Sequence, residues 1–121
     1  NMKKDAGRLA EFLALIPRGT RAAFEFRHPS WFDDQVFGLM RDHAGALCIA
    51  EAEDGVEVPF VSTADWGYVG LRMADYSGAD LKAWLERIRG QLWKDVFVFF
   101  KHEDEGKGPE LAKQFLKIAG R

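Results

Sequence analysis

The 121-residue sequence predicts one α/β domain, spanning residues 1–121, in which strands of a mostly parallel sheet alternate with covering helices. Two observations predict this fold class. Short apolar runs that suit buried strands alternate with amphipathic segments that have helical spacing. In addition, residues 96–100 are apolar throughout, as expected for a strand covered on both faces, and such strands are typical of parallel sheets.

The first part of the chain is expected to form a helix, a strand and a second helix. Residues 3–16 form the first helix, which Pro17 ends, and its buried face carries Leu9, Phe12, Leu13 and Ile16. Residues 22–26 form a short strand. Ser30 and Asp33 are spaced as in a capping box, so a second helix is expected from Ser30 to about residue 44, with Gly45 as its C-terminal cap.

The remaining elements follow the same alternation. Residues 46–50 and 67–71 are expected strands, joined by a loop without an obvious helix. Ser77 and Asp80 repeat the capping pattern before a helix that ends at Gly90. After the fourth strand and a polar loop, a last helix is expected from about Pro109 to Gly120. Its inward face should carry Leu111, Phe115, Leu116 and Ile118.

Composition and charge argue against several classes of protein. The chain is 47% hydrophobic with a net charge of −2, so it has no overall attraction to nucleic acid or to an anionic membrane. No apolar stretch approaches the roughly 20 residues of a membrane-spanning helix, and no signal peptide is recognisable. A single cysteine, Cys48, excludes an internal disulfide and is expected to be a small buried residue. We therefore expect a cytoplasmic protein.

Polar side chains of interest lie where the expected strands end. Functional groups of parallel α/β folds gather at the carboxyl ends of strands, and Glu25, Arg27, His28 and Trp31 lie at the first such end. A carboxylate inside a strand is costly unless it has a partner. Glu25 is therefore either an acid, base or anchor beside an anion-binding Arg27 and a stacking Trp31, or half of a buried ion pair that holds the loop.

Two further strand ends carry candidate groups. Arg72 leaves the third strand at its carboxyl end, where it can meet an anion. Lys101 and His102 follow the fourth strand, in the position of a general base or of metal ligands. The spacing matches no known metal motif, so no metal site is predicted, and the sequence leaves the identity of any cofactor unknown. The chain has no P-loop and no Gly-x-Gly-x-x-Gly, so nucleotide binding has little support.

Several segments together resemble the YecE-like family, a widespread family of unknown function. The most diagnostic segment is Glu-Phe-Arg-His-Pro-Ser-Trp at residues 25–31. The resemblance continues in order through residues 63–65, 68–72 and 95–104 and then into the last helix. It covers nearly all of the chain. One position departs from the pattern, because Gly70 stands where the family usually has an arginine after Tyr-Val, which weakens the transfer of an anion-binding role to that strand.

The resemblance implies a TIM-like β/α barrel, a fold of typically about 250 residues. This chain would be its C-terminal half, with about four strands and their covering helices. A half-barrel exposes two sheet edges and an apolar face. We therefore expect a homodimer or other homo-oligomer, or association with the N-terminal half of such a barrel.

Two classes of function stay open. The first is an enzyme or enzyme remnant that acts on an anionic or phosphorylated substrate at the barrel mouth. Its catalytic residues would be Glu25, His28 and His102, and its substrate-binding residues Arg27, Trp31, Arg72 and Lys101. The second is a non-catalytic module that binds a small ligand or, although the net negative charge of the chain argues against it, nucleic acid. In either case an isolated half-barrel would be inactive, because half of the site is missing.

Overall fold

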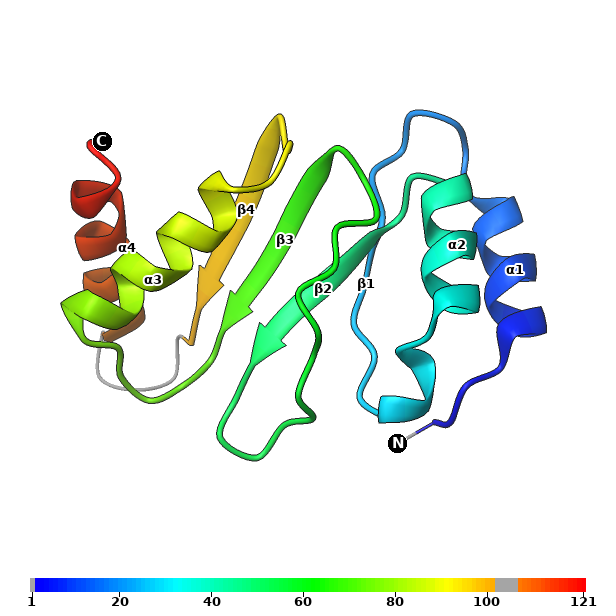
Figure 1. Ribbon diagram of the computed structural model, residues 1–121, viewed down its shortest axis with the longest axis horizontal. Coiled ribbons are helices and arrows are strands. Elements are labelled where there is room, and N and C mark those ends of the chain that lie inside the picture. The colour runs from blue at the N-terminus through cyan, green and yellow to red at the C-terminus, as the bar shows by residue number, and fades with distance from the viewer. Residues whose placement is uncertain (1, 102–106) are drawn as a thin grey trace.

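In the described part of the chain, four strands and four helices follow one another in the order that the sequence predicts, with β2 and β3 joined by a loop (Figure 1). The computed structural model describes residues 2–101 and 107–121. The elements are α1 (Ala6–Leu15), β1 (Ala23–Phe24), the 3₁₀ turn η1 (Pro29–Trp31), α2 (Asp34–Asp42), β2 (Ala46–Glu51), β3 (Trp66–Leu71), α3 (Gly78–Arg89), β4 (Asp95–Phe100) and α4 (Lys107–Ile118). Within the described residues no helix is long and apolar enough to span a membrane. The cytoplasmic location stays a prediction.

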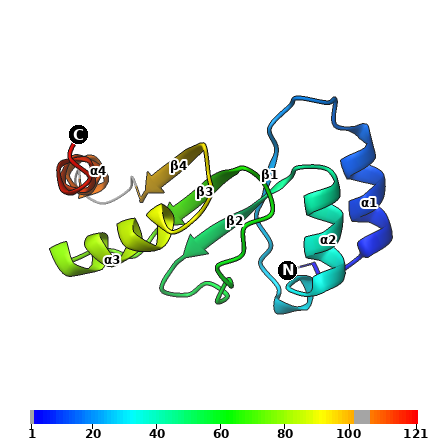
Figure 2. The ribbon, with the colours of Figure 1, turned by 45° about the horizontal axis from the view of Figure 1, so that its top comes forward.

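The four strands form one parallel sheet in the order β1-β2-β3-β4. All carboxyl ends therefore lie at the same end of the sheet (Figure 1). Ile49 is paired with Val69, and Val69 with Val98, so these side chains point to one face of the sheet. α3 and α4 pack on that face, and α1 and α2 pack beside β1 and β2 (Figures 1 and 2).

The core consists of two apolar clusters on the helix-covered face. One joins α1 and α2 to Leu47 of β2, and the other joins α3 and α4 to Ile49 and Val69. Burying one such side chain contributes about 1.5–3 kcal/mol. Cys48 lies on the other face and is also buried, as the sequence predicts. The loop between β2 and β3 is held by Thr63, whose hydroxyl donates to the Gly45 carbonyl at 2.6 Å and accepts from the Leu47 amide at 3.0 Å.

The second face of the sheet carries no helix in the described part of the chain, and this overturns the expectation that β4 is covered on both faces. Phe97 and Phe99 are 42% and 45% exposed, whereas Phe100 on the helix side is buried. At the amino ends of the strands, Arg21 crosses this open face and donates to Asp95 at 2.8 Å, with its guanidinium 5.3 Å from the ring centre of Trp66. This reach from before β1 to β4 indicates that the open face is concave.

Phe12 and Leu116 were also expected to be buried, but they are 53% and 51% exposed. With 3.6 residues per turn, successive side chains of a helix point about 100° apart, so Phe12 and Leu116 point to the side of the core-facing residue next to them. The neighbouring positions in these helices, Leu13 and Phe115, are the ones that reach the core.

The start of α2 also differs from the expectation. Asp33, and not Ser30, is the N-cap, because its side chain accepts from the Val36 amide at 2.9 Å. Pro29 favours the separate turn η1, so Ser30 lies inside that turn. The hydroxyl of Ser30 accepts from the Lys4 amide at 2.7 Å instead. The expected strand at residues 22–26 is likewise shortened to β1, because only two of its residues pair with β2.

The end of α2 places Ala44, and not Gly45, in the left-handed conformation, with φ of 54°. The Gly45 amide donates to the Met40 carbonyl and the Ala44 amide to the Arg41 carbonyl, which is the Schellman pattern of helix ends. In α4 the equivalent position is Gly120, with φ of 84°. Glycine at this position is free of the Cβ strain that an alanine incurs. The capping box of Ser77 and Asp80 at the start of α3 is confirmed.

We expect Ala44→Gly to raise the free energy of unfolding by about 0.5–1 kcal/mol, because relief of left-handed strain exceeds the added entropy of the unfolded chain. The matched control is Gly45→Ala, whose new Cβ would lie 3.2 Å from the ring of Phe24 and would destabilise the fold. Urea denaturation of the two variants measures both changes. A loss of stability in Ala44→Gly would contradict the assigned conformation.

Self-association of the chain stays a prediction. The uncovered face of the sheet and its two outer edges are the surfaces through which it would occur. β1 and β4 are the outer strands of the sheet, so each has one backbone edge without a strand partner among the described residues. We expect light scattering over a concentration series to give a mass above that of the 13.7 kDa monomer. A monomer at every concentration would contradict the prediction.

Candidate functional site

A cleft of about 710 Å³ opens at the carboxyl ends of the strands. It lies on the open face, at the position where the sequence predicts functional groups. The lining residues that matter for its chemistry are Glu25, Arg27, Tyr68, Arg72, Phe99 and Lys101. They come from β3 and β4 and from the residues that directly follow β1, β3 and β4, so parallel pairing is what brings them together.

Glu25 and Arg72 form a bidentate ion pair at the centre of this group. The two terminal nitrogens of Arg72 donate to the two carboxylate oxygens of Glu25 at 2.8 and 2.9 Å. Nε of Arg27 adds a longer hydrogen bond of 3.3 Å to the same carboxylate. The sequence predicts a partner for Glu25, but the main partner is Arg72 from β3, and Arg27 is secondary.

Small side chains on β2 make this pair possible. β2 lies between β1 and β3, and on the open face it presents Cys48 and Ala50, paired with Tyr68 and Gly70 respectively. A long side chain at either β2 position would separate Glu25 from Arg72. Sequence reasoning missed the pair because it requires the strand order, which the local pattern does not contain.

Gly70 provides the surface on which the Arg72 guanidinium lies. A Cβ added at Gly70 would be 3.6 Å from Nε and 3.7 Å from a terminal nitrogen of Arg72. The guanidinium therefore folds back over position 70, two residues earlier on the same face. A larger side chain at this position would occupy the space that the guanidinium now fills.

The ion pair determines the protonation states in the cleft. The hydrogen bond from Arg72, with its charge and that of Arg27, holds the pKa of Glu25 below the ordinary value of 4.5, against the opposing effect of burial. Glu25 is therefore ionised at neutral pH. Burial, and secondarily the Glu25 charge, raises the pKa of the Cys48 thiol to about 11, which makes it a neutral thiol and not a nucleophile.

The described lining of the cleft carries charges of both signs. Arg27, Arg72 and Lys101 are its cations, and Glu25 and Asp54 are its carboxylates. Within residues 2–101 and 107–121, no group of three His, Cys, Asp or Glu side chains is placed to hold a metal ion. The chemistry that this set can perform is the binding of an anion by cationic hydrogen-bond donors.

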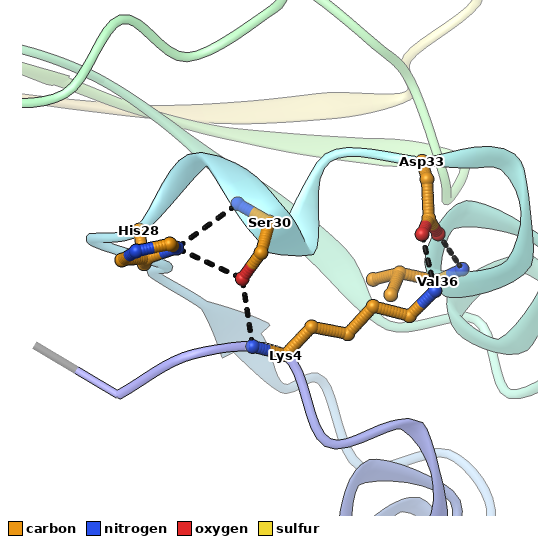
Figure 3. A network of polar contacts seen from close by, with 5 residues as sticks. All are labelled: Lys4, His28, Ser30, Asp33 and Val36. Carbon is orange, nitrogen blue, oxygen red and sulfur yellow. Dashed lines mark hydrogen bonds and ion pairs between the residues drawn. The ribbon is translucent and has the colours of Figure 1, made fainter.

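His28 lies outside the cleft lining and belongs to a structural network (Figure 3). Its Nδ1 accepts from the Ser30 amide at 3.1 Å and lies 2.8 Å from the Ser30 hydroxyl, which in turn holds the Lys4 amide. The Lys4 ammonium pairs with Asp33, the cap of α2. The network thus ties the N-terminal segment to η1 and α2, and Nδ1 of His28 is already used.

Trp31 is a core residue, with 6% of its surface exposed. Its ring stacks on Phe26 with a centroid distance of 4.5 Å, and its Nε1 donates to the Met2 carbonyl at 2.8 Å. It does not line the cleft, so the structure gives no surface of Trp31 for a ligand there. His102, the third predicted catalytic residue, lies outside the described residues.

Sequence reasoning missed Tyr68 and Phe99, although a signal for both was present. Side chains two residues apart in a strand point to the same face, so Tyr68 shares a face with Arg72. Phe99 likewise precedes Lys101 by two residues. Extending the alternation backwards from each polar strand end would have added both rings to the site.

Comparisons with known proteins agree with this fold. A family model described as "Protein of unknown function DUF72" matches residues 1–121. A solved DUF72 family protein from Thermotoga maritima is 21% identical with a TM-score of 0.81, and the match covers 98% of this chain and 54% of that one. A second, from Enterococcus faecalis, is 20% identical with a TM-score of 0.77, covering 100% and 57%. Comparison with curated proteins finds no match.

This chain therefore spans about half the length of the solved structures it matches. The four parallel strands and four helices correspond to about half of the barrel seen in that family, which confirms the predicted partial barrel. At these identities the likeness shows the fold alone.

Replacing Glu25 by glutamine should lower the free energy of unfolding by about 1 kcal/mol at pH 7, because Arg72 loses its charged partner. The pKa of Glu25 is lower in the folded than in the unfolded chain, so its contribution is complete above about pH 4.5 and is lost as the pH falls through the folded-state pKa. The difference between wild type and Glu25→Gln should shrink in that acid range.

Chemical denaturation at a series of pH values measures this difference. Glu11→Gln, which removes an exposed carboxylate of α1, is the control and should show no comparable loss at pH 7. If the deficit of Glu25→Gln persists undiminished in acid, the ion pair with Arg72 is not its source.

Proposed function

The chain belongs to the DUF72 family, and from that premise we propose that the cleft at the carboxyl ends of its strands binds a small anionic, phosphorylated substrate. The observation that carries the proposal is the bidentate Glu25–Arg72 pair, which fixes a guanidinium in the cleft lining. Arg27 and Lys101 line the same cleft and add positive charge.

The pair supports anion binding because it orients Arg72 without using all of its donors. A guanidinium has five N–H donors, and Glu25 accepts two hydrogen bonds from it. The side chain of Arg72 is 39% exposed, so an anion can reach the remaining donors. A planar guanidinium that is already held in place loses little freedom when it binds a phosphate.

Glu25 serves in this proposal to orient Arg72. Its lowered pKa makes it a weak base and an unsuitable acid at neutral pH, although its carboxylate can accept a hydrogen bond from a substrate hydroxyl. The substrate-binding residues are Arg27, Arg72 and Lys101. The proposal does not depend on His28 or Trp31, which lie elsewhere, and a catalytic role of His102 stays a prediction.

The position of the cleft favours an enzyme over a simple binding module. Active sites of β/α barrels lie at the carboxyl ends of the strands, and this cleft occupies that end. Since the chain spans about half of the solved relatives, the remaining strand ends of such a barrel would supply further groups to the same mouth. A binding module would use the same three cationic side chains, Arg27, Arg72 and Lys101. A turnover assay therefore distinguishes an enzyme from a binding module.

Titration with inorganic phosphate, followed by NMR shifts of backbone amides, tests the binding step. We expect the largest shifts at the ends of β1, β3 and β4. Arg72→Gln should weaken binding about tenfold, the effect of losing a charge-assisted hydrogen bond of about 1.5 kcal/mol. Binding should also weaken as salt is raised.

Arg21→Gln is the matched control, because Arg21 lies on the same face at the amino ends of the strands. It removes the same charge from the chain but should leave phosphate affinity nearly unchanged. Equal losses in the two variants, or phosphate shifts away from the strand ends, would refute the proposed site. Unchanged NMR spectra of each variant in the absence of phosphate confirm that it is folded.

A further inference from the structure

We propose that the substrate of this cleft carries a planar ring next to its anionic group, and that the ring stacks on Phe99. This inference rests on the proposed anion site at Arg72 and specifies its substrate class. The ring would be aromatic, and its phosphate or other anionic group would be attached directly or through one or two atoms.

The first support is an aromatic wall in the cleft. Tyr68 of β3 and Phe99 of β4 both line it, with ring centroids 5.1 Å apart and planes inclined by 30°. Phe99 is 45% exposed, so a large part of its ring is open to a ligand. Aromatic side chains of this kind bind flat rings through stacking.

The second support is the position of this wall relative to the proposed anion site. Phe99 is the paired residue of Gly70 across the β3–β4 ladder. The guanidinium of Arg72 lies over Gly70, with its nitrogens 3.6–3.7 Å from where a Cβ would stand. Neighbouring strands are about 4.8 Å apart, so Phe99 and the guanidinium occupy adjacent positions on one face. An anion held by Arg72 therefore brings its attached group next to Phe99.

A second phenylalanine on the same strand distinguishes this arrangement from general apolar exposure. Phe97 faces the same side and is 42% exposed, yet it does not line the cleft. It packs edge-on against Trp66, with centroids 5.8 Å apart, and the Arg21 guanidinium lies 6.0 Å from its ring centre. Phe97 thus packs against Trp66 and Arg21 away from the cleft, whereas Phe99 packs against Tyr68 of the same aromatic wall and lines the cleft.

The test compares three probes: inorganic phosphate, phenyl phosphate and cyclohexyl phosphate, titrated into the chain by calorimetry. We expect phenyl phosphate to bind about tenfold more tightly than inorganic phosphate and several-fold more tightly than cyclohexyl phosphate, because only the flat ring can stack. NMR contacts between the phenyl protons and the Phe99 ring should accompany binding.

Phe99→Leu keeps an apolar side chain but removes the ring. It should abolish the preference, so that phenyl phosphate binds this variant no more tightly than inorganic phosphate does. Phe97→Leu is the matched control and should retain the preference. Comparable loss in both variants would overturn the inference, because the effect would then not be specific to the cleft.

The two proposals fail in different ways. If inorganic phosphate binds in an Arg72-dependent manner and phenyl phosphate binds no more tightly, the ring inference is overturned and the anion site stands. If none of the three probes binds, the anion site itself is overturned and the inference falls with it.

Discussion

The order of the strands is the constraint from which the rest of the structure follows. Four parallel strands that succeed one another in sequence order require each connection to step in the same direction along the sheet. Crossovers between parallel strands are right-handed in about 98% of cases, and connections of one hand and one direction pass over one face. In the described part of the chain the helices therefore gather on that face, and the other face is left to side chains of the strands and of the segments that flank them. The same parallel order brings every strand's carboxyl end to one edge.

Because the helices cover only one face of the sheet, the candidate site can form on the other face. On the helix face, pairs such as Ile49 and Val69 are buried and fix the pleat of each strand. The alternate positions are consequently directed to the open face, where small residues of β2 leave room for Glu25 and Arg72 to meet. The core thus positions the candidate site through the two-residue period of the strands, and its members Phe26 and Phe100 also line the cleft.

The sequence predicted features that depend on local chemistry and missed those that depend on neighbours. The capping box of Ser77 and Asp80 was predictable, because both partners lie within one turn. The equivalent prediction for Ser30 failed, because Ser30 lies in the separate turn η1 and its hydroxyl accepts from the Lys4 amide of the distant N-terminal segment. The partner of Glu25 was only half predicted, since Arg72 is 47 residues away. The exposure of Phe97 could not be predicted either, because the sequence of an apolar strand is the same whether or not a second layer of structure covers it.

Gly70 shapes the part of the open face that the Arg72 guanidinium occupies. Residues 70 and 72 project on the same side of β3, and the guanidinium lies back over position 70, with Nε 3.6 Å from where a Cβ would stand. A guanidinium is thereby supplied from the strand end, where Glu25 fixes its orientation. A cation delivered in this way lies at the cleft mouth with one edge held by a carboxylate, and that geometry suits recognition of an anion entering from the carboxyl end.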